Sequence, residues 1–359
     1  MSFLSISYVN FRNLKDATHD IGYPEVFLVG KNGQGKTNFL EALYISSYGV
    51  SFKRVNEGHV FKNGTNSCSI TTLYRKNMDI THSIFVGYDK GRKLVQKDMK
   101  KIERKELVSI APCILFYMSD IDFIAGSQIR KRFFFDQCLA MYDSSYIVLL
   151  NSYLKILMAK NVIIKTQQNL ELLRIYNEQI SVLALSIVKK RLDLIEEFNQ
   201  EFSCIYQKIS GIDNVNINYK STVDFDTENE LFESLQEKRN LEIKIGTSVI
   251  GPHRDKISFV RENILFEKEA SNGQRRLMSL VLRILQAKFY NSKMNEKPIL
   301  LMDDVMLELD IEKKQKVISL LPSYKQLFCT FLQGESFDDY KTDNTKIFFV
   351  ENGVLSERN

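Results

Sequence analysis

The chain opens with short apolar runs that indicate β-strands. Residues 4–9 alternate between apolar and polar side chains, and residues 25–29 (EVFLV) form a compact apolar run that stops at Gly30. From residue 36 the spacing changes, with apolar side chains at positions 39, 40, 43 and 44, which predicts a helix that buries one face. The N-terminal part therefore predicts a strand, a glycine-rich loop and a helix in succession.

The middle of the chain changes from a β pattern to a helical one. Residues 67–97 alternate again, and the DKG triplet at 89–91 is typical of a hairpin turn, so we expect an antiparallel β layer. Residues 127–210 have the periodicity of long helices and end at a Ser-Gly pair. Residues 212–240 are polar and acidic, which is consistent with a short strand, a loop and a helix.

The C-terminal part returns to an α/β pattern. It contains a β-like stretch at 243–250, a helix at 275–290, an apolar strand at 299–302, and strands at 326–331 and 346–355. We expect an α/β fold in which residues 1–122 and 245–359 form one lobe and residues 123–244 form a helical lobe. The chain has no internal repeat, and the helical lobe is too short for a long coiled coil.

Composition and charge exclude few classes of protein. Lys and Arg number 49 against 44 Asp and Glu, a formal charge of +5 that permits an acidic partner without demanding one. The lysine-rich stretches at 97–105 and 189–191 are most simply solvated faces. Five scattered cysteines without a CxxC pair argue against structural zinc. The sequence lacks a signal peptide and a run of about 20 apolar residues, so we expect a cytoplasmic protein without a membrane span.

Residues 30–37 (GKNGQGKT) fit the phosphate-binding pattern GxxxxGK[ST]. Glycines allow successive backbone N–H groups to face phosphates, Lys36 reaches the β- and γ-phosphates, and the Thr37 hydroxyl is a ligand for Mg²⁺. With a strand before it and a helix after it, the motif predicts that the chain binds ATP and Mg²⁺. The expected nucleotide contacts are Gly30, Lys31, Asn32, Gly33, Gln34, Gly35, Lys36, Thr37 and Asn38.

Two acids follow the apolar run at 299–302. We assign Asp303 to the Mg²⁺ shell, because an acid at the end of a buried strand commonly holds this metal beside a phosphate-binding loop. Asp304 is expected to point the other way out of the strand and to orient or deprotonate the attacking water. An acidic cap at the end of a strand is the structural alternative for both.

A third motif, Ser271 to Gln274 (SNGQ), precedes an amphipathic helix. A serine at a helix N-terminus is suited to bind an anion, although a capping box between Ser271 and Gln274 explains the same pattern. Its position shortly before the acid pair favours nucleotide contacts from Ser271, Gly273 and Gln274. Lys36, Asp304 and Ser271 are the expected catalytic residues.

Together these motifs resemble the ATPase heads of the ABC superfamily, in the SMC-like branch that acts in DNA repair. The resemblance narrows to the RecF family of bacterial recombination mediators through residues 10–13 (NFRN), 126–136, 204–211 and 251–255 (GPHRD), and it extends over nearly the whole chain. It implies an ABC-type head with a mixed sheet and an antiparallel β layer, an inserted helical lobe and no long coiled coil.

The resemblance also implies a function. Members of the family form an ATP-dependent homodimer in which the signature serine, here Ser271, completes the site of the opposite subunit. They bind DNA at single-strand gaps and junctions, hydrolyse ATP slowly, and help to load RecA with RecO and RecR in repair, replication restart and SOS induction. The expected location is therefore the cytoplasm, in association with the nucleoid.

Further site residues follow only from this resemblance. Arg12 is expected near the nucleotide or its ribose, Lys131 and Arg132 at head or DNA contacts, and His253 and Arg254 at the site or the DNA face. Structural ion pairing is an equal alternative for these residues.

Two departures from the family put the rate of hydrolysis in doubt: Leu307 replaces a serine, and the switch position is Thr330 instead of histidine. Two other functions stay open. One is an ATP- and DNA-binding scaffold with incidental turnover. The other is a transporter ATPase subunit, which the long insertion before Ser271 disfavours.

Overall fold

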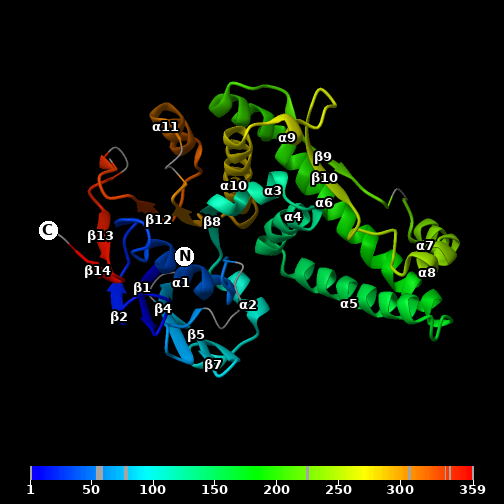
Figure 1. Ribbon diagram of the computed structural model, residues 1–359, viewed down its shortest axis with the longest axis horizontal. Helices are drawn as coiled ribbons and strands as arrows, with labels where there is room; N and C mark the ends of the chain where they lie inside the picture. Colours follow the sequence, from blue (N-terminus) through cyan, green and yellow to red (C-terminus); the bar gives the residue numbers. More distant parts are fainter. Residues whose placement is uncertain are drawn as a thin grey trace. The chain divides into compact units, whose positions relative to one another are not determined.

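The computed structural model describes residues 2–53, 60–76, 80–223, 226–305, 309–335, 337–338 and 341–357 (Figure 1). The chain divides into two compact units, Met1–Asp120 with Gln286–Asn359, and Ile121–Leu285. The chain returns to the first unit at Gln286, within helix α10 (Asn272–Met294). This boundary lies later in the chain than the lobe boundary expected at 244–245.

The first unit contains a six-stranded sheet in the order β14-β13-β3-β12-β11-β8, in which all pairs except β13–β14 are parallel. Its strands are β3 (Glu25–Val29), β8 (Cys113–Tyr117), β11 (Ile299–Asp303), β12 (Gln326–Phe331), β13 (Thr345–Glu351) and β14 (Val354–Ser356). Strands β3, β11 and β12 are buried along their whole length, which explains their continuous apolar runs. The strands expected at these positions are confirmed.

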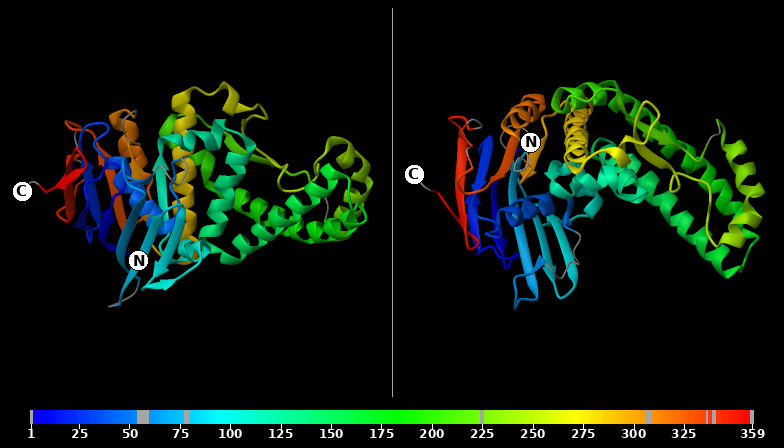
Figure 2. Two further views of the ribbon diagram at one scale, coloured as in Figure 1. Left: turned by 60° about the horizontal axis from the view of Figure 1, so that its bottom comes forward. Right: turned by 45° about the horizontal axis from the view of Figure 1, so that its top comes forward.

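The second sheet of this unit is antiparallel and has the order β2-β1-β4-β5-β6-β7 (Figure 2). Its strands are β1 (Ser2–Val9), β2 (Ala17–Asp20), β4 (Ser67–Arg75), β5 (Thr81–Asp89), β6 (Arg92–Lys97) and β7 (Lys100–Lys101). Lys90 and Gly91 have φ angles of 45° and 77°, so they form the two-residue hairpin turn expected between β5 and β6. The antiparallel β layer is confirmed.

Helix α1 (Lys36–Tyr48) lies between the two sheets. It packs on β4 and β5 of the antiparallel sheet and on β8, β11 and β12 of the parallel sheet. Eleven of its 13 residues are buried, including Ser46 and Ser47, whose hydroxyls donate to the carbonyls of Ala42 and Leu43. The expectation that this helix buries a single face was wrong, because both sheets cover it and hydroxyl groups on its second face are satisfied internally. Helices α2 (Arg104–Ile110) and α11 (Ile311–Leu320) complete the unit.

The second unit is mainly helical. It contains α3 (Asp122–Ala125), α4 (Gln128–Tyr142), α5 (Ser144–Thr166), α6 (Leu172–Ser210), α7 (Glu228–Glu237), α8 (Arg239–Ile245) and α9 (Phe266–Glu269), with the antiparallel strands β9 (Val215–Lys220) and β10 (Lys256–Arg261). Gly211, with φ 78°, ends α6 as expected. The β-like reading of residues 243–250 was wrong. Ile245 closes a helix that Gly246 (φ 83°) caps in the left-handed conformation.

Helix α5 is long and apolar enough to cross a membrane by length and composition alone, a test that core helices of soluble proteins also pass. Only 28% of the most apolar stretch of α5 is buried. Asn151, Lys155, Lys160 and Asn161 interrupt its sequence, so the helix contains no run of about 20 apolar residues and the expectation made from the sequence stands. Within its own unit α5 packs on α6 and α8, and its fully buried Lys160 forms a 2.8 Å ion pair with Glu242 of α8.

A candidate nucleotide-binding site

The glycine-rich loop connects β3 to α1, as expected. Gly33 and Gly35 have φ angles of 78° and 121°, which L-residues rarely adopt. A side chain at Gly35 would come within 2.8 Å of Leu14 and 3.1 Å of Asn13. Gly35 also stands at the N-cap of α1 and has no side chain to cap it, so the first N–H groups of the helix are available to an anion.

Lys36 is only 4% exposed and lies against the loop. Its Nζ donates to the carbonyl oxygens of Gly30 (2.8 Å) and Lys31 (3.2 Å). The ammonium is thus held at the end of β3, where the loop surrounds it. A phosphate bound at the start of α1 meets a positive charge that is already desolvated.

The end of β11 brings an acid to the same loop. The Thr37 hydroxyl donates to Oδ1 of Asp303 at 3.0 Å. Strand β12 pairs in parallel with both β3 and β11, so the carboxyl ends of these strands lie at one edge of the sheet. The expected pairing of the loop with this acid is therefore present in the structure.

Asp304 does not follow the alternation expected of a strand. Strand β11 ends at Asp303, and Asp304 adopts a left-handed conformation with φ 50°. Its Oδ1 lies 3.0 Å from the Thr330 hydroxyl, which is also 3.3 Å from Oδ1 of Asp303, and its N–H donates to the same hydroxyl at 2.8 Å. The two carboxylates therefore converge on Thr330 instead of pointing apart. Thr330 itself lies within β12, not after it.

This convergence changes the acidity of Asp303. Burial raises its pKa to about 6, and the charge of Asp304 adds to this effect, while hydrogen bonds from Thr37 and Thr330 and the charge of Lys53 oppose it. A carboxylate that burial makes costly to charge gains most from a cation placed beside it. Asp303 is thus suited to share a metal ion with Thr37.

Arg12 does not face an open site. Its Nε and one terminal nitrogen donate to the two oxygens of Glu41, at 3.0 and 2.5 Å. Glu41 is fully buried in α1 and also binds Lys53 (3.0 Å) and Ser51 (2.5 Å). The structural ion pair, the alternative left open for Arg12, is the arrangement observed, because a buried carboxylate requires charged partners.

Asn38 joins this network to the loop. Its side chain accepts from Lys53 (2.5 Å) and donates to Asn13 (2.7 Å), and Asn13 in turn donates to the carbonyl of Gly33 (3.1 Å). Asn38 thus orients the loop through Asn13.

A turn from the C-terminal end of the chain supports the loop on its other side. The N–H of Asn352 donates to the Gln34 side chain at 2.6 Å, and the N–H of Gly353 donates to the Gln34 carbonyl at 3.0 Å. Beside them lies a polar hollow of about 320 Å³ that Lys31, Gln333 and Glu351 help to line. Gln34 is therefore held at both its side chain and its backbone.

Ser271 precedes α10 in the second unit. Its Oγ accepts from the N–H of Gln274 (3.2 Å), and the Gln274 side chain accepts from the N–H of Ser271 (2.7 Å). This reciprocal pair is the capping box considered above. Ser271, Asn272 and Gly273 are all exposed, so the helix N-terminus faces solvent.

Lys131 is 2% exposed, and its ammonium pairs with Glu267 at 2.7 Å beneath the ring of Phe259. It therefore does not face solvent. Arg132 is half-buried and donates to the carbonyl of Asp255 at 2.6 Å. In this structure both cations serve to hold the second unit together.

The GPHRD segment is the centre of a buried charge network in the same unit. Asp255 is fully buried and accepts from Tyr219, Ser221 and Thr222. Arg191, 3% exposed, donates to both oxygens of Asp136 (2.8 and 2.9 Å) and lies 3.7 Å from Asp255. Because Asp255 and Arg191 are almost completely buried, each of these charges requires a partner of opposite charge or a hydrogen bond.

His253 and Arg254 differ in exposure. The ring of His253 is half-buried between the Tyr153 hydroxyl (2.6 Å) and the carbonyl of Ser248 (3.3 Å). Arg254 is exposed and donates to the same carbonyl at 2.8 Å. Five residues were carried over from the family on the resemblance, and among them Arg254 is the one with an exposed side chain.

Several residues of the site were not identified from the sequence. Glu41 follows the loop by four residues and reads as an ordinary polar position of a helix, and only the covering sheets make it a buried charge. Asn352 and Gly353 form a pair typical of a hairpin turn, but nothing local connects them to Gln34. Leu307, the departure from the family noted above, lies outside the described residues.

The residues present fit ATP and a divalent cation. Mg²⁺ prefers oxygen ligands and commonly uses one or two protein groups together with substrate phosphates, which Thr37 and Asp303 match. Among the described residues no cluster of three His, Cys, Asp or Glu side chains forms an independent metal site.

Comparison with known proteins assigns the chain to a family. Residues 3–356 match the family described as RecF/RecN/SMC N terminal domain. The DNA replication and repair protein RecF of Treponema pallidum (strain Nichols) is 42% identical over 352 residues, which cover 97% of this chain and 99% of that protein. The RecF protein of Clostridium botulinum (strain Eklund 17B / Type B) is 31% identical, with 99% of each chain covered.

Solved structures agree with these relatives. A structure of the recombination mediator protein RecF with ATP, from the RecFOR pathway, has a TM-score of 0.88 and 26% identity and covers 99% of this chain and 97% of that one. An Smc head bound to the C-terminal winged-helix domain of ScpA has a TM-score of 0.58 at 15% identity, which indicates a shared fold. The family match over residues 3–356 and the RecF relatives, together with the ABC-type head and the phosphate-binding loop, show the family. The chain belongs to the RecF family of DNA replication and repair proteins.

Proposed function

We propose that this protein is an ATP-dependent DNA-binding repair protein that uses ATP to form a homodimer and slow hydrolysis to release it. The observation that carries the proposal is the meeting of Thr37, Asp303, Asp304 and Thr330 at the sheet edge beside Lys36. A solved relative from the RecFOR pathway contains ATP, which supports the same ligand for this chain.

The roles of the side chains follow from their positions. Lys36 and the first N–H groups of α1 bind the phosphates, while Thr37 and Asp303 hold Mg²⁺, which neutralises phosphate charge when bound. Asp304 orients the attacking water, since Thr330 fixes its carboxylate and backbone together. Proton transfer to Asp304 is the expected general-base step.

Dimer formation rests on Ser271. It lies at an exposed helix N-terminus that is suited to an anion, and in the family this position meets the γ-phosphate held by the opposite subunit. A ligand that contacts both subunits stabilises the dimer by mass action.

Analytical ultracentrifugation with a slowly hydrolysed ATP analogue tests the proposal. Wild type should become dimeric with the analogue, whereas Lys36→Ala should stay monomeric because it loses the phosphate contact. Ser271→Arg should bind nucleotide but fail to dimerise or hydrolyse it. Normal hydrolysis by Ser271→Arg would exclude a shared site.

The DNA-binding part of the proposal rests on the family. Gapped duplex DNA is the expected ligand, RecO- and RecR-like proteins and indirectly RecA are the expected partners, and the cytoplasm is the expected location. ATP turnover measured with and without gapped DNA separates a DNA-stimulated switch from a scaffold with incidental turnover. A scaffold would show no stimulation.

A further inference from the structure

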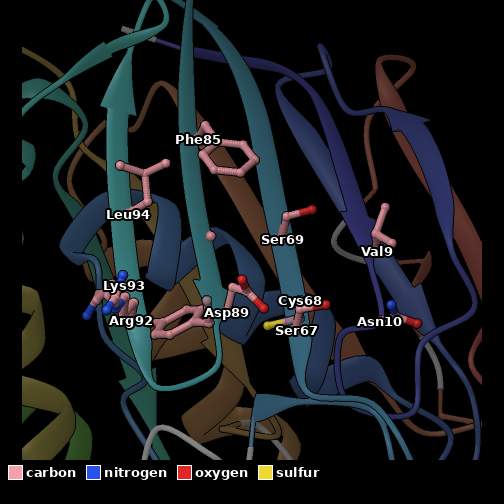
Figure 3. Close-up of a pocket in the computed structure, with 12 residues that line it drawn as sticks. Val9, Asn10, Ser67, Cys68, Ser69, Phe85, Asp89, Arg92, Lys93 and Leu94 are labelled. Atoms are coloured by element: carbon pink, nitrogen blue, oxygen red, sulfur yellow. The ribbon is translucent and has the colours of Figure 1, made fainter.

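The outer face of the antiparallel sheet carries a hollow that the nucleotide site does not use (Figure 3). Its volume is about 450 Å³. The strand register brings Val9, Ser69, Gly87 and Leu94 into one row across four strands. Val9 and Leu94 are exposed, at 44% and 38%, which gives the hollow an apolar floor.

An aromatic ring lies in this hollow. A Cβ at Gly87 would come within 2.7 and 2.8 Å of two ring carbons of Phe85, so the ring leans over the glycine two residues along the strand. Phe85 is half-buried, and Thr71 and Gln96 stand opposite it on the neighbouring strands. Gly87 thus makes room for a ring against the outer face of the sheet.

Positive charge is concentrated along the same edge. Residues 90–101 hold six lysines and arginines and one acid, an excess of five that equals the formal charge of the whole chain, +5. The single acid, Asp98, is bonded to His82 (2.8 Å) and to the N–H of Ser83 (2.8 Å), so its charge is directed toward β5.

Two of these cations lie on the face that carries the ring. Arg92 stands opposite Asp89 at one end of the hollow, and Lys101 stands opposite Gln96 at the other. Both are exposed, and within the described parts of the chain neither forms an ion pair. They are separated by the length of β6, roughly 13 Å for four residues of strand.

We propose that the outer face of the antiparallel sheet binds single-stranded DNA, with one unpaired base stacked on Phe85 and flanking phosphates at Arg92 and Lys101. An aromatic ring on a sheet with basic residues beside it is the general arrangement for binding unpaired bases. Ser67, Ser69 and Asp89 at the rim supply hydroxyl and carboxylate partners for base edges. The inference rests on the proposed function and adds to it a site for the unpaired strand.

The hollow favours a single strand over a duplex. A base within a duplex has both faces covered by its neighbours, so it has no face to offer to Phe85. An unpaired base of the kind found in a gap is free to enter a concave apolar site. A duplex would contact only Arg92 and Lys101 and gain nothing from the ring.

Fluorescence anisotropy with the full chain tests this site. The probes are a labelled single strand and the duplex of the same sequence, each titrated at several salt concentrations. The variants are Phe85→Ala and the double change Arg92→Glu with Lys101→Glu. A matched control, Lys297→Glu with Lys325→Glu, reverses two exposed charges in the same unit, just before the N-terminal ends of the parallel strands β11 and β12.

Phe85→Ala should weaken single-strand binding about tenfold at every salt concentration while leaving duplex binding unchanged, since one stacked base is lost. The double variant Arg92→Glu with Lys101→Glu should weaken single-strand binding at least about tenfold. It should also reduce the slope of log K against log salt by about 1.4, because each phosphate contact contributes about 0.7. The control pair should leave affinity and slope unchanged.

Three results would overturn the site while the proposed function stands: wild-type affinity in both test variants, an equal loss of duplex binding in Phe85→Ala, or an equal loss in the control pair. If wild type binds neither DNA, the proposed function itself fails. Photo-crosslinking of a halogenated single strand, followed by peptide mapping, should place the crosslink on Phe85.

Discussion

The Thr37 hydroxyl and the Asp303 carboxylate are 266 residues apart in the chain and 3.0 Å apart in the structure. Each is an oxygen ligand of the kind that Mg²⁺ prefers, and each stands at the carboxyl edge of the parallel sheet. Their contact joins the phosphate-binding loop to the carboxylate at the end of β11, so the two form one site.

Replacement of Thr37 by valine should weaken Mg²⁺-dependent nucleotide binding by at least about tenfold, because a bond to a charged group contributes about 1.5–3 kcal/mol. Thr37→Ser should restore most of the affinity, since it keeps the hydroxyl. Isothermal titration calorimetry with ADP, with and without Mg²⁺, measures both. An equal loss in the absence of Mg²⁺ would contradict the metal role.

Thr330→Val should reduce ATP turnover far more than nucleotide affinity. The hydroxyl accepts from the N–H of Asp304 and lies beside both carboxylates, so its removal takes away the group on which the two acids converge. Loss of these hydrogen bonds is expected to cost about 1 kcal/mol of stability. Thr330→Ser should rescue both effects. Steady-state ATP turnover and equilibrium nucleotide binding measure the two effects separately. A fall in nucleotide affinity without a fall in turnover would contradict the role of Thr330 in positioning Asp304.

Gly353→Ala should weaken ATP binding although Gly353 does not belong to the phosphate-binding motif. An added Cβ would stand 1.9 Å from the Asn13 carbonyl oxygen and 3.1 Å from Leu14 Cα, so the turn must shift and its hydrogen bonds to Gln34 are disturbed. Gly64→Ala is the matched control, because Gly64 has a similar φ of 85° and open space around it.

Both alanines should lose about 1–2 kcal/mol of stability to left-handed backbone strain, and Gly353→Ala should lose more because its Cβ also meets Asn13. Only Gly353→Ala should lose nucleotide affinity. Urea denaturation and nucleotide titration measure the two effects separately. Equal nucleotide affinity in the two variants would show that the turn does not support the loop.

His253 should make the protein less stable in acid. Burial lowers its pKa to about 4, and nearby Arg254, Arg132 and Lys160 add to this effect. Because the Ser248 carbonyl only accepts, Nε2 carries the proton of the neutral ring and Nδ1 accepts from Tyr153. An unfolded histidine has a pKa near 6.5, so the unfolded chain binds more protons between the two values.

The stability due to the neutral ring is therefore complete above pH 6.5 and is lost as the pH falls toward 4, by up to about 3 kcal/mol. Urea denaturation of wild type and His253→Gln across this range is the measurement. The glutamine variant should show a shallower loss in acid. Parallel curves would contradict the assignment.

Much of the fold was predictable from local pattern. The runs at 25–29, 299–302 and 326–331 are buried on both faces of a parallel sheet, so their composition alone indicates strands. The DKG turn and the Ser-Gly helix end were predictable because their backbone conformations require particular residues. The segment at 243–250 misled because its isoleucines fit a strand as well as the end of a helix, and Gly246 decided between them.

The sequence by itself determined the phosphate-binding loop, because glycine conformations, a lysine and a hydroxyl must follow one another within a few residues. It also identified Asp303, whose buried strand is a local pattern. The convergence of Asp304 on Thr330, the pairing of Arg12 with Glu41, the burial of Lys131 and the support of Gln34 by Gly353 were decided only by the tertiary structure. Each joins groups distant in the chain, and burial there obliges charges and donors to find partners that no local pattern specifies.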